Sequence, residues 1–251
     1  MAAGVKPVVY LYGVSESRLP AAIDETGVGR AAIEHVLGEG VVCWISRVPA
    51  REFERDLARN LENLDWVASE SVAHQRAIAA IREKVDILPA RFGTVFRGES
   101  SLKRHVLGRL PQLKRDFKRL KGADEWGVKV FVWKQVATPA KVTSGRQYLM
   151  AKAALLPKRE ASGDTNGELG KFREALGRVA LASAAPGSIS GSQPGLRFQT
   201  TILVKRSDRK KLESVLTRFS RRWSEQRKIE CSGPWPPYSF VSTARGSADS
   251  R

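Results

Sequence analysis

The chain of 251 residues contains only two cysteines and three histidines. Cys43 and Cys231 lie in separate apolar, strand-like stretches, so the sequence predicts buried reduced thiols rather than a disulfide or a metal-binding pair. No second His or Cys lies at metal-ligand spacing from His74, which argues against a zinc or iron centre. We therefore expect neither a metal nor any other cofactor.

Long hydrophobic runs are also missing. No apolar run approaches the roughly 20 residues that a membrane-spanning helix needs. The first residues lack the charged, apolar and cleavage regions of a secretory signal and lead directly into a predicted strand. These absences predict a cytoplasmic protein with no membrane insertion.

Motifs for catalysis are absent as well. The sequence has no phosphate-binding P-loop, no dinucleotide-binding glycine motif, no GxSxG and no HExxH. His74 points into the middle of the apolar stripe of its predicted helix, which is typical of a hydrogen-bonded core histidine. The adjacent carboxylates Asp124 and Glu125 are explained equally well by salt bridges at a junction. The sequence predicts a protein that is not an enzyme and has no small-molecule substrate.

Acidic residues are few for a chain with so many basic ones. Lysine and arginine number 43 against 26 aspartates and glutamates, which gives a net charge of +17. The excess is +5 in residues 1–121 and +12 in residues 122–251. Such a field attracts nucleic acid, anionic membranes or acidic proteins, and the charge alone does not decide between them.

Strands and helices alternate in both halves of the chain. The predicted strands are 8–14, 40–48, 86–96, 125–133, 196–205 and 228–233. The predicted helices are 49–61, 65–84, 100–121, one that begins at a Ser144 cap, one that ends near 181, and 208–226. This order predicts an α+β fold with two domains, each a small mixed or antiparallel sheet with packed helices. We place the domains at 1–121 and 122–241, followed by a flexible tail at 242–251. The second would form a modified ferredoxin-like sheet if one more strand pairs.

Two helices carry a basic face opposite an apolar stripe. In the helix predicted at 208–226, five apolar side chains cover about 100° of arc. The opposite face carries Lys210, Lys211, Arg218, Arg221 and Arg222. In the helix predicted at 100–121 the basic residues are Lys103, Arg104, Lys114, Arg115, Lys118 and Arg119. Pro111 interrupts this second stripe, which predicts either a kink or two abutting helices. Basic helix faces are most often simply solvated.

A nucleic-acid-binding module is the alternative function. In the strand at 125–133, Lys129, Phe131 and Trp133 share one face, and a basic sheet face with aromatic residues can stack bases. No run resembles the aromatic signature of RNA-recognition domains, however, and a sheet face covered by helices explains the pattern equally well. The sequence therefore does not favour nucleic acid as a partner.

Several segments together resemble one family. "DILPARFGTVF" (86–96), "EWGVKVFVW" (125–133) and "CSGPWPPYSFV" (231–241) are similar to segments of the gas vesicle accessory protein family GvpF/GvpL. "YLYGV" (10–14), "SRVPAREF" (46–53) and "SGRQYL" (144–149) fit the same pattern in the same order. The resemblance runs from Tyr10 to about Val241, and it departs in the length and composition of 157–196 and in the basic excess. It does not separate the F-like from the L-like branch.

The resemblance implies a two-domain, non-enzymatic protein of the gas vesicle, where it would act as an assembly factor or minor component. Its partners would be the small hydrophobic shell protein and other accessory proteins, and it would limit aggregation of the shell protein during nucleation. We expect the basic face of 208–226 to contact acidic partner surfaces. The resemblance also marks a set of residues that we expect to be structural: Arg91, Phe92, Gly93, Thr94, Trp126, Trp235, Pro236, Pro237 and Tyr238.

The prolines at 234–237 raise a separate question. Pro236 and Pro237 exclude a helix and hold the preceding residues extended. The stretch could be a ligand for a domain that binds proline-rich peptides. The following Phe240 and Val241 look like anchors to a core, and this favours an extended arm packed on the body of the protein.

Overall fold

The computed structural model describes residues 7–16, 22–132, 167–185, 193–223 and 227–242. The chain forms two compact units, of which the first comprises Met1–Glu125 and Pro234–Arg251 and the second Trp126–Gly233. This division differs from the predicted domains at 1–121 and 122–241, because the segment after Gly233 makes its contacts with the N-terminal residues. The first unit is therefore discontinuous in sequence.

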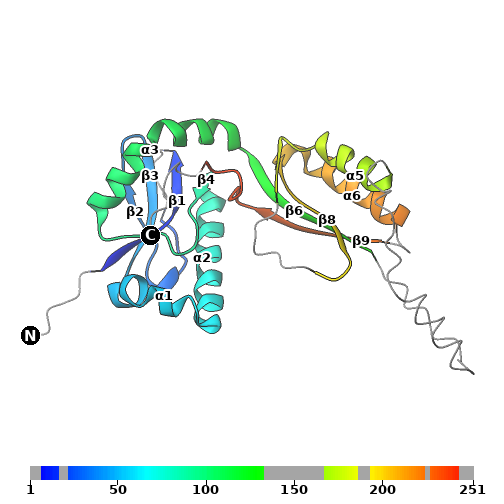
Figure 1. Ribbon diagram of the computed structural model, residues 1–251. Helices are drawn as coiled ribbons and strands as arrows, with labels where there is room; N and C mark the ends of the chain where they lie inside the picture. Colours follow the sequence, from blue (N-terminus) through cyan, green and yellow to red (C-terminus); the bar gives the residue numbers. More distant parts are fainter. Residues whose placement is uncertain (1–6, 17–21, 133–166, 186–192, 224–226, 243–251) are drawn as a thin grey trace, which may run out of the picture. The chain divides into compact units, whose positions relative to one another are not determined.

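The first unit is built on an antiparallel sheet. Its strands are β1 (Val8–Glu16), β2 (Glu34–Leu37), β3 (Val41–Val48), β4 (Ile87–Pro89) and β5 (Val95–Phe96). The sheet order is β2-β3-β1-β4, and β5 also pairs with β1. All residues of β1 except the last are buried, and this strand contacts both α2 (Leu64–Lys84) and α3 (Glu99–Leu120). Figure 1 shows β1 in the middle of this sheet. Burial on both faces explains why β1 reads as a continuous apolar run rather than as an alternating one.

The long helices of this unit confirm the predicted amphipathic patterns. The helix α2 is capped by Asn63, whose side chain accepts hydrogen bonds from the amides of Asp65 and Trp66. The helix α3 is a single helix that contains Pro111 in its interior. Of the two alternatives for the predicted helix at 100–121, two abutting helices is therefore wrong.

The segment predicted as one helix at 49–61 is instead split in two. Arg51–Arg55 form a wide π-type turn, closed by a hydrogen bond from the Asp56 amide to the Arg51 carbonyl (2.8 Å). The short helix α1 (Leu57–Asn60) follows. The π-type turn contains Phe53, which is fully buried against Tyr10 and Trp66.

The second unit has a four-stranded sheet in the order β7-β8-β6-β9. The strands are β6 (Ala123–Val132), β7 (Ala182–Ala184), β8 (Leu196–Lys205) and β9 (Arg227–Trp235), so β6 begins and β9 ends in the first unit. The helices α5 (Glu168–Gly177) and α6 (Arg209–Trp223) cover one face of the sheet (Figure 1). The core between them contains Phe172, Phe219 and Trp223 from the helices.

The α+β fold class is confirmed, whereas the ferredoxin-like form of the second sheet stays a prediction. Alternate residues of β6 face the helices as expected, with Trp126, Val128 and Val130 in the core. The predicted Ser144 cap with its helix and Trp133 lie outside the described residues, as does the tail after Ser242.

The two thiols differ in their surroundings. Both cysteines are free; Cys43 is buried, but Cys231 is exposed on β9, the last strand of its sheet. The prediction of burial was wrong for Cys231 because an edge strand leaves part of its side chains open to solvent. Within the described ranges, no helix is long and apolar enough to cross a membrane.

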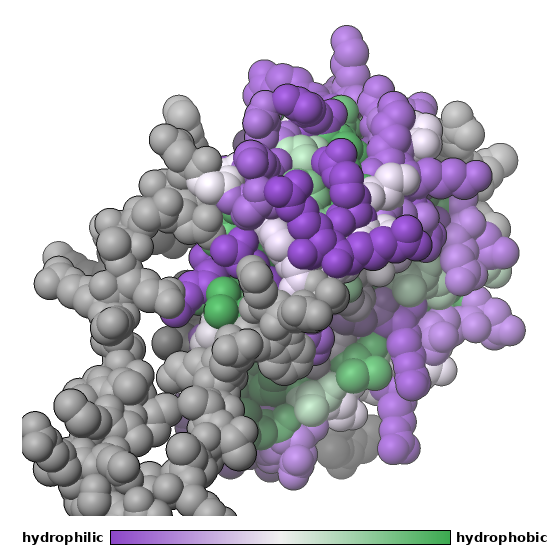
Figure 2. Space-filling view, turned by 90° about the vertical axis from the view of Figure 1, so that its right-hand side faces the viewer, coloured by the Kyte–Doolittle hydropathy of each residue, from purple (hydrophilic) through white to green (hydrophobic). Residues whose placement is uncertain are grey.

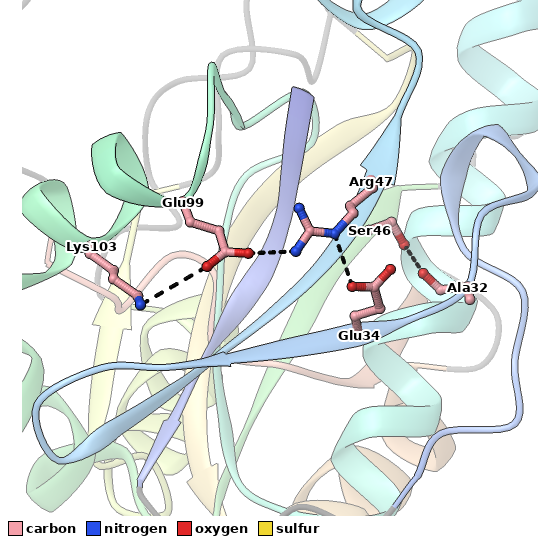
Figure 3. Close-up of polar contacts among 6 residues, drawn as sticks. All are labelled: Ala32, Glu34, Ser46, Arg47, Glu99 and Lys103. Carbon is pink, nitrogen blue, oxygen red and sulfur yellow. Dashed lines mark hydrogen bonds and ion pairs between the residues drawn. The ribbon is translucent and has the colours of Figure 1, made fainter. Parts of the chain in front are cut away.

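One exposed polar cluster joins three elements of the first unit (Figure 3). Arg47 on β3 donates hydrogen bonds to Glu34 on β2 (3.1 Å) and to Glu99 at the start of α3 (2.5 Å). The guanidinium holds the pKa of Glu99 below its usual range. Beside it, the Ser46 hydroxyl donates to the carbonyl of Ala32 (2.7 Å). Since Arg47 and Glu99 are about 40% exposed (42% and 38%), solvent screens the pair and its contribution to stability is small.

Candidate functional site: a histidine cluster and two basic helix faces

His74 lies at the centre of the first unit. Its side chain is 1% exposed, and its ring contacts Tyr10, Tyr12, Phe92 and Tyr238, with ring centroids 5.7 to 6.4 Å apart. The Tyr10 hydroxyl lies 2.9 Å from His74 Nδ1, and the Tyr238 hydroxyl lies 3.5 Å from Nε2. The prediction of a hydrogen-bonded core histidine is confirmed.

The direction of the bonds around this ring follows from the tautomer of His74. The Gly93 amide donates to the Tyr10 hydroxyl (3.1 Å). In the tautomer with its proton on Nε2, Tyr10 donates to Nδ1 and the Nε2 proton faces Tyr238, whose hydroxyl donates to Gln75 (3.4 Å). Burial lowers the pKa of His74 to about 4, so the neutral ring is the stable form at neutral pH.

A turn between β4 and β5 supplies the Gly93 amide. Gly93 has a φ of +78°, a conformation that residues with a Cβ atom rarely adopt. The Thr94 hydroxyl donates to the carbonyl of Arg91 (2.7 Å), and the Thr94 carbonyl accepts from the amide of Leu11 (2.9 Å). Phe92 packs against Trp66 and His74. The turn is therefore fixed to β1 by its backbone groups and to α2 by the side chain of Phe92.

The C-terminal segment closes the opposite side of the cluster. Pro236, Pro237 and Phe240 are buried, and Tyr238 packs against the core of the first unit. The predicted packing of this segment on the body of the protein is confirmed, but its extended form was wrong for residues 238–241, which form a turn. The chain turns back on itself after Pro237, whose carbonyl accepts from the amides of Phe240 and Val241 (both 3.1 Å).

Two carboxylates hold this segment in the same way. Glu125 accepts from both the amide and the hydroxyl of Ser239 (2.7 and 2.8 Å). Asp116 on α3 accepts from the amide and the hydroxyl of Ser242 (both 2.9 Å). Arg119 donates to the Phe240 carbonyl (2.5 Å). Burial raises the pKa of Glu125, while the two bonds from Ser239 act in the opposite direction.

The surroundings of His74 do not leave its ring open to a substrate. His74 is closed off from solvent, and both of its ring nitrogens face tyrosine hydroxyls. Among the described residues, no group of three or more His, Cys, Asp and Glu side chains could hold a metal ion. What the arrangement does is connect β1, α2, the turn after β4 and the C-terminal segment.

The remaining residues marked by the family resemblance lie apart from this cluster. Arg91 is exposed on the turn, and Trp235 is 45% exposed. Trp126 lies in the core of the second unit, where the guanidinium of Arg209 stacks 5.7 Å from the centre of its ring.

The basic face of α6 is exposed as predicted, but its five residues differ in their partners. Arg222 donates a hydrogen bond to Glu168 on α5 (2.9 Å) and forms an ion pair with the same carboxylate (2.8 Å), and Lys211 pairs with Asp208 (2.8 Å). Arg218 stacks on the neighbouring Phe219 ring, 5.1 Å from its centre. Lys210 and Arg221 form no ion pair with a described residue. Figure 2, which faces the side where α5 and α6 lie in Figure 1, is largely hydrophilic over its upper half.

The sheet face that the nucleic-acid alternative would use is only partly exposed to solvent. Lys129 on β6 donates to Gln193 (3.3 Å), and Phe131 is half-buried. On β8 the corresponding Gln199 and Thr201 are also half-buried.

Sequence reasoning missed how the marked residues meet. Tyr10 lies in "YLYGV" and Tyr238 in "PPYSF", and both segments carried the family resemblance, yet nothing in the sequence joined them to His74. Asp116 and Glu125 were not expected to bind the C-terminal segment. The spacing of Ser239 and Ser242, three residues apart after a Pro-Pro pair, was the available signal.

Comparison with known proteins is consistent across nearly the whole chain. Residues 8–242 match the family described as "Gas vesicle synthesis protein GvpL/GvpF". The chain is 31% identical over 221 residues to Gas vesicle protein L of Streptomyces sp. (strain CB03234), which covers 81% of each chain.

Two solved structures share the fold. The crystal structure of the gas vesicle protein GvpF from Anabaena sp. PCC7120 has a TM-score of 0.69 at 16% identity and covers 97% of this chain and 100% of its own. That of gas vesicle protein GvpF from Microcystis aeruginosa has a TM-score of 0.64 at 17% identity, with 94% and 99% covered.

Proposed function

Since the chain belongs to the gas vesicle synthesis protein family GvpL/GvpF, we propose that it is an assembly factor or minor component of the vesicle. In this proposal it binds the small hydrophobic shell protein and other accessory proteins, and it limits aggregation of the shell protein during nucleation. The match of residues 8–242 to the family is the observation that carries the proposal.

Physical chemistry gives such a factor a clear task. A small protein with apolar faces and open strand edges aggregates unless these are shielded before it enters the shell. An adaptor with a high net charge keeps such a complex in solution and speeds its encounter with acidic partners. The net charge of +17 fits this requirement.

The α6 basic face is the contact surface that we propose, and within it we favour Lys210, Arg218 and Arg221. Lys210 and Arg221 form no ion pair with a described residue, and the guanidinium of Arg218 stacks on a ring and keeps its charge available. Arg222 and Lys211 already have acidic partners. Reversal of Arg222 would also remove the ion pair between α5 and α6, so we leave it unchanged.

The test is capture of the shell protein on co-expression with the tagged full chain. The variant R218E/R221E should retain its melting temperature and capture less shell protein at moderate salt. The matched control R55E/R76E makes the same change in net charge at two exposed arginines of the first unit that form no ion pair with a described residue. If both variants capture as much shell protein as the wild type, the α6 basic face is not the contact.

A second measurement addresses the shell protein itself. Light scattering of freshly diluted shell protein should rise more slowly in the presence of the wild-type chain. If the chain captures no shell protein and leaves scattering unchanged, the proposed function is wrong. Absorbance near 260 nm that co-purifies with the chain and is lost at high salt would instead point to nucleic acid.

A further inference from the structure

The outward face of α3 has an unusual composition. We define the α3 outer face as the seven exposed residues Arg104, Leu107, Gly108, Pro111, Lys114, Arg115 and Lys118. Their spacing follows the three-four repeat of a helix-packing seam over about 21 Å of helix axis. The α3 outer face lies opposite the buried stripe of the same helix, which contains Leu102, Val106, Leu113 and Phe117.

The charges of this face are all of one sign. Arg104, Lys114, Arg115 and Lys118 form no ion pair with a described residue, and no acidic residue belongs to the face. The two acidic residues of α3 are engaged elsewhere. Glu99 pairs with Arg47 on β3, and Asp116 holds Ser242 and Arg119. The positive charge of the face is therefore not compensated by its surroundings.

The centre of the α3 outer face is uncharged, and it is recessed at Gly108, which has no side chain. Leu107 is 52% exposed, and a Cβ atom placed on Gly108 would meet nothing within 4 Å. Pro111 has no amide hydrogen to donate to the carbonyl of Leu107, which leaves that acceptor without its helical partner. The centre thus combines an exposed apolar side chain with a notch at the glycine.

Neither the backbone conformation nor the packing of the described residues requires a glycine at position 108. Glycine is less favourable than alanine in a helix interior, and Gly108 does not have the positive φ that would require it. Nothing packs against it either. A glycine that allows another backbone to approach closely is the remaining physical use for it.

We propose that the α3 outer face binds an acidic amphipathic helix of another gas vesicle protein. A ridge of small apolar side chains on that helix would lie over Gly108 and against Leu107, and its flanking carboxylates would pair with Arg104 and Arg115. An uncharged centre within a charged rim is the arrangement of protein interfaces. The choice of partners rests on the proposed function, whereas the surface is argued from α3 alone.

Nucleic acid fits this face less well. A duplex is held by cations that contact phosphates, and an exposed leucine beside a proline would offer its backbone nothing. The face also carries no aromatic residue on which a single-stranded base could stack. The uncharged centre therefore favours a protein helix over nucleic acid as the ligand of the α3 outer face.

The experiment uses the tagged full chain, co-expressed in turn with the shell protein and with each accessory protein of the same organism. G108L should fill the notch and reduce capture of at least one of them by about tenfold. R104E/R115E should reduce capture of the same protein to a similar degree. The controls A79L, which adds a leucine to an exposed position of α2, and R55E/R76E, which reverses two exposed arginines without an ion pair to a described residue, should capture it normally.

G108A separates binding from folding. Because alanine favours the helix, this variant should raise the melting temperature by about 2 °C while it weakens capture of the same protein. A loss of capture in a variant that is more stable than the wild type cannot come from misfolding.

The outcomes separate this inference from the proposed function. If the wild type captures partners and G108L and R104E/R115E capture them equally, the α3 inference is wrong and the proposed function stands. If the wild type captures none, both are wrong. If R104E/R115E weakens binding of a 20-base-pair DNA duplex in fluorescence anisotropy while G108L changes no capture, the face serves nucleic acid and the inference is again overturned.

Discussion

Tyr10 and His74 lie 64 positions apart in the sequence and share a hydrogen bond of 2.9 Å in the core of the first unit. The tyrosine comes from the central strand β1 and the histidine from α2. Gly93 and Tyr238 extend the same series of bonds on either side. Four segments of the chain thus meet around one imidazole ring, and the stability of the unit should depend on that ring.

The first prediction concerns pH. Unfolded histidine has a pKa of 6.5, whereas burial lowers that of His74 to about 4 in the folded chain. Between these values the unfolded state binds the proton and the folded state does not, so stability falls as pH drops from 6.5 to 4. The full difference is about 3 kcal/mol. Urea unfolding at pH 7, 5.5 and 4.5 measures it.

H74Q is the control for that measurement. Glutamine cannot titrate, so the variant should be less stable at pH 7 but should lose less further stability on acidification. If wild type and H74Q show the same dependence on pH, His74 is not the titrating group.

The second prediction ranks the two tyrosines that face His74. Y10F leaves the Gly93 amide without its acceptor and His74 Nδ1 without its donor; His74 is buried, and the Gly93 amide is partly buried. Unsatisfied buried groups of this kind should cost about 2 kcal/mol. Y238F removes two longer contacts, of 3.5 and 3.4 Å, at the edge of the cluster and should cost less than about 1 kcal/mol. Midpoints of urea unfolding at pH 7.5 give the comparison. A larger loss of stability in Y238F than in Y10F would contradict the arrangement of bonds that we infer around His74.

The third prediction concerns the C-terminal segment. A chain that ends after Gly233 lacks buried Phe240 and the serines bound by Glu125 and Asp116. Loss of a buried phenylalanine alone costs about 3 kcal/mol, so the melting temperature should fall by about 10 °C and solubility should decrease. A chain that ends after Ser242 is the matched control and should melt like the full chain. Equal melting temperatures for the two truncated chains would mean that the segment does not stabilise the first unit.

Periodicity in the sequence predicted the elements that are long and bury one face. The helices α2, α3 and α6 each place apolar residues three and four apart, and β1, β3, β6 and β8 are runs of β-branched and aromatic residues. The strands β2, β5 and β7 contain only four, two and three residues. Such segments are too short to show a period, and their pairing with a neighbouring strand alone defines them.

The His74 cluster could be predicted only in part. The burial of His74 followed from its place on the apolar stripe of α2, whereas the turn at Gly93 was missed, because residues 86–96 were predicted as one strand. The bonds to Tyr10 and Tyr238 bridge 64 and 164 positions, which no local pattern records. The placement of the last segment with the first unit was missed for the same reason, since sequence neighbours suggested a continuous second domain.

The division of the first unit between the two ends of the chain has a consequence during synthesis. Ribosomes release the chain from its N-terminus at about 5–20 residues per second. The strands and helices up to Glu125 therefore emerge well before Phe240 and the serines that Glu125 and Asp116 bind. Until residues 234–242 have been synthesised, the nascent first unit has its Tyr10 and His74 side uncovered and must persist as an incomplete fold. Any chain that ends before Phe240 stays in that state.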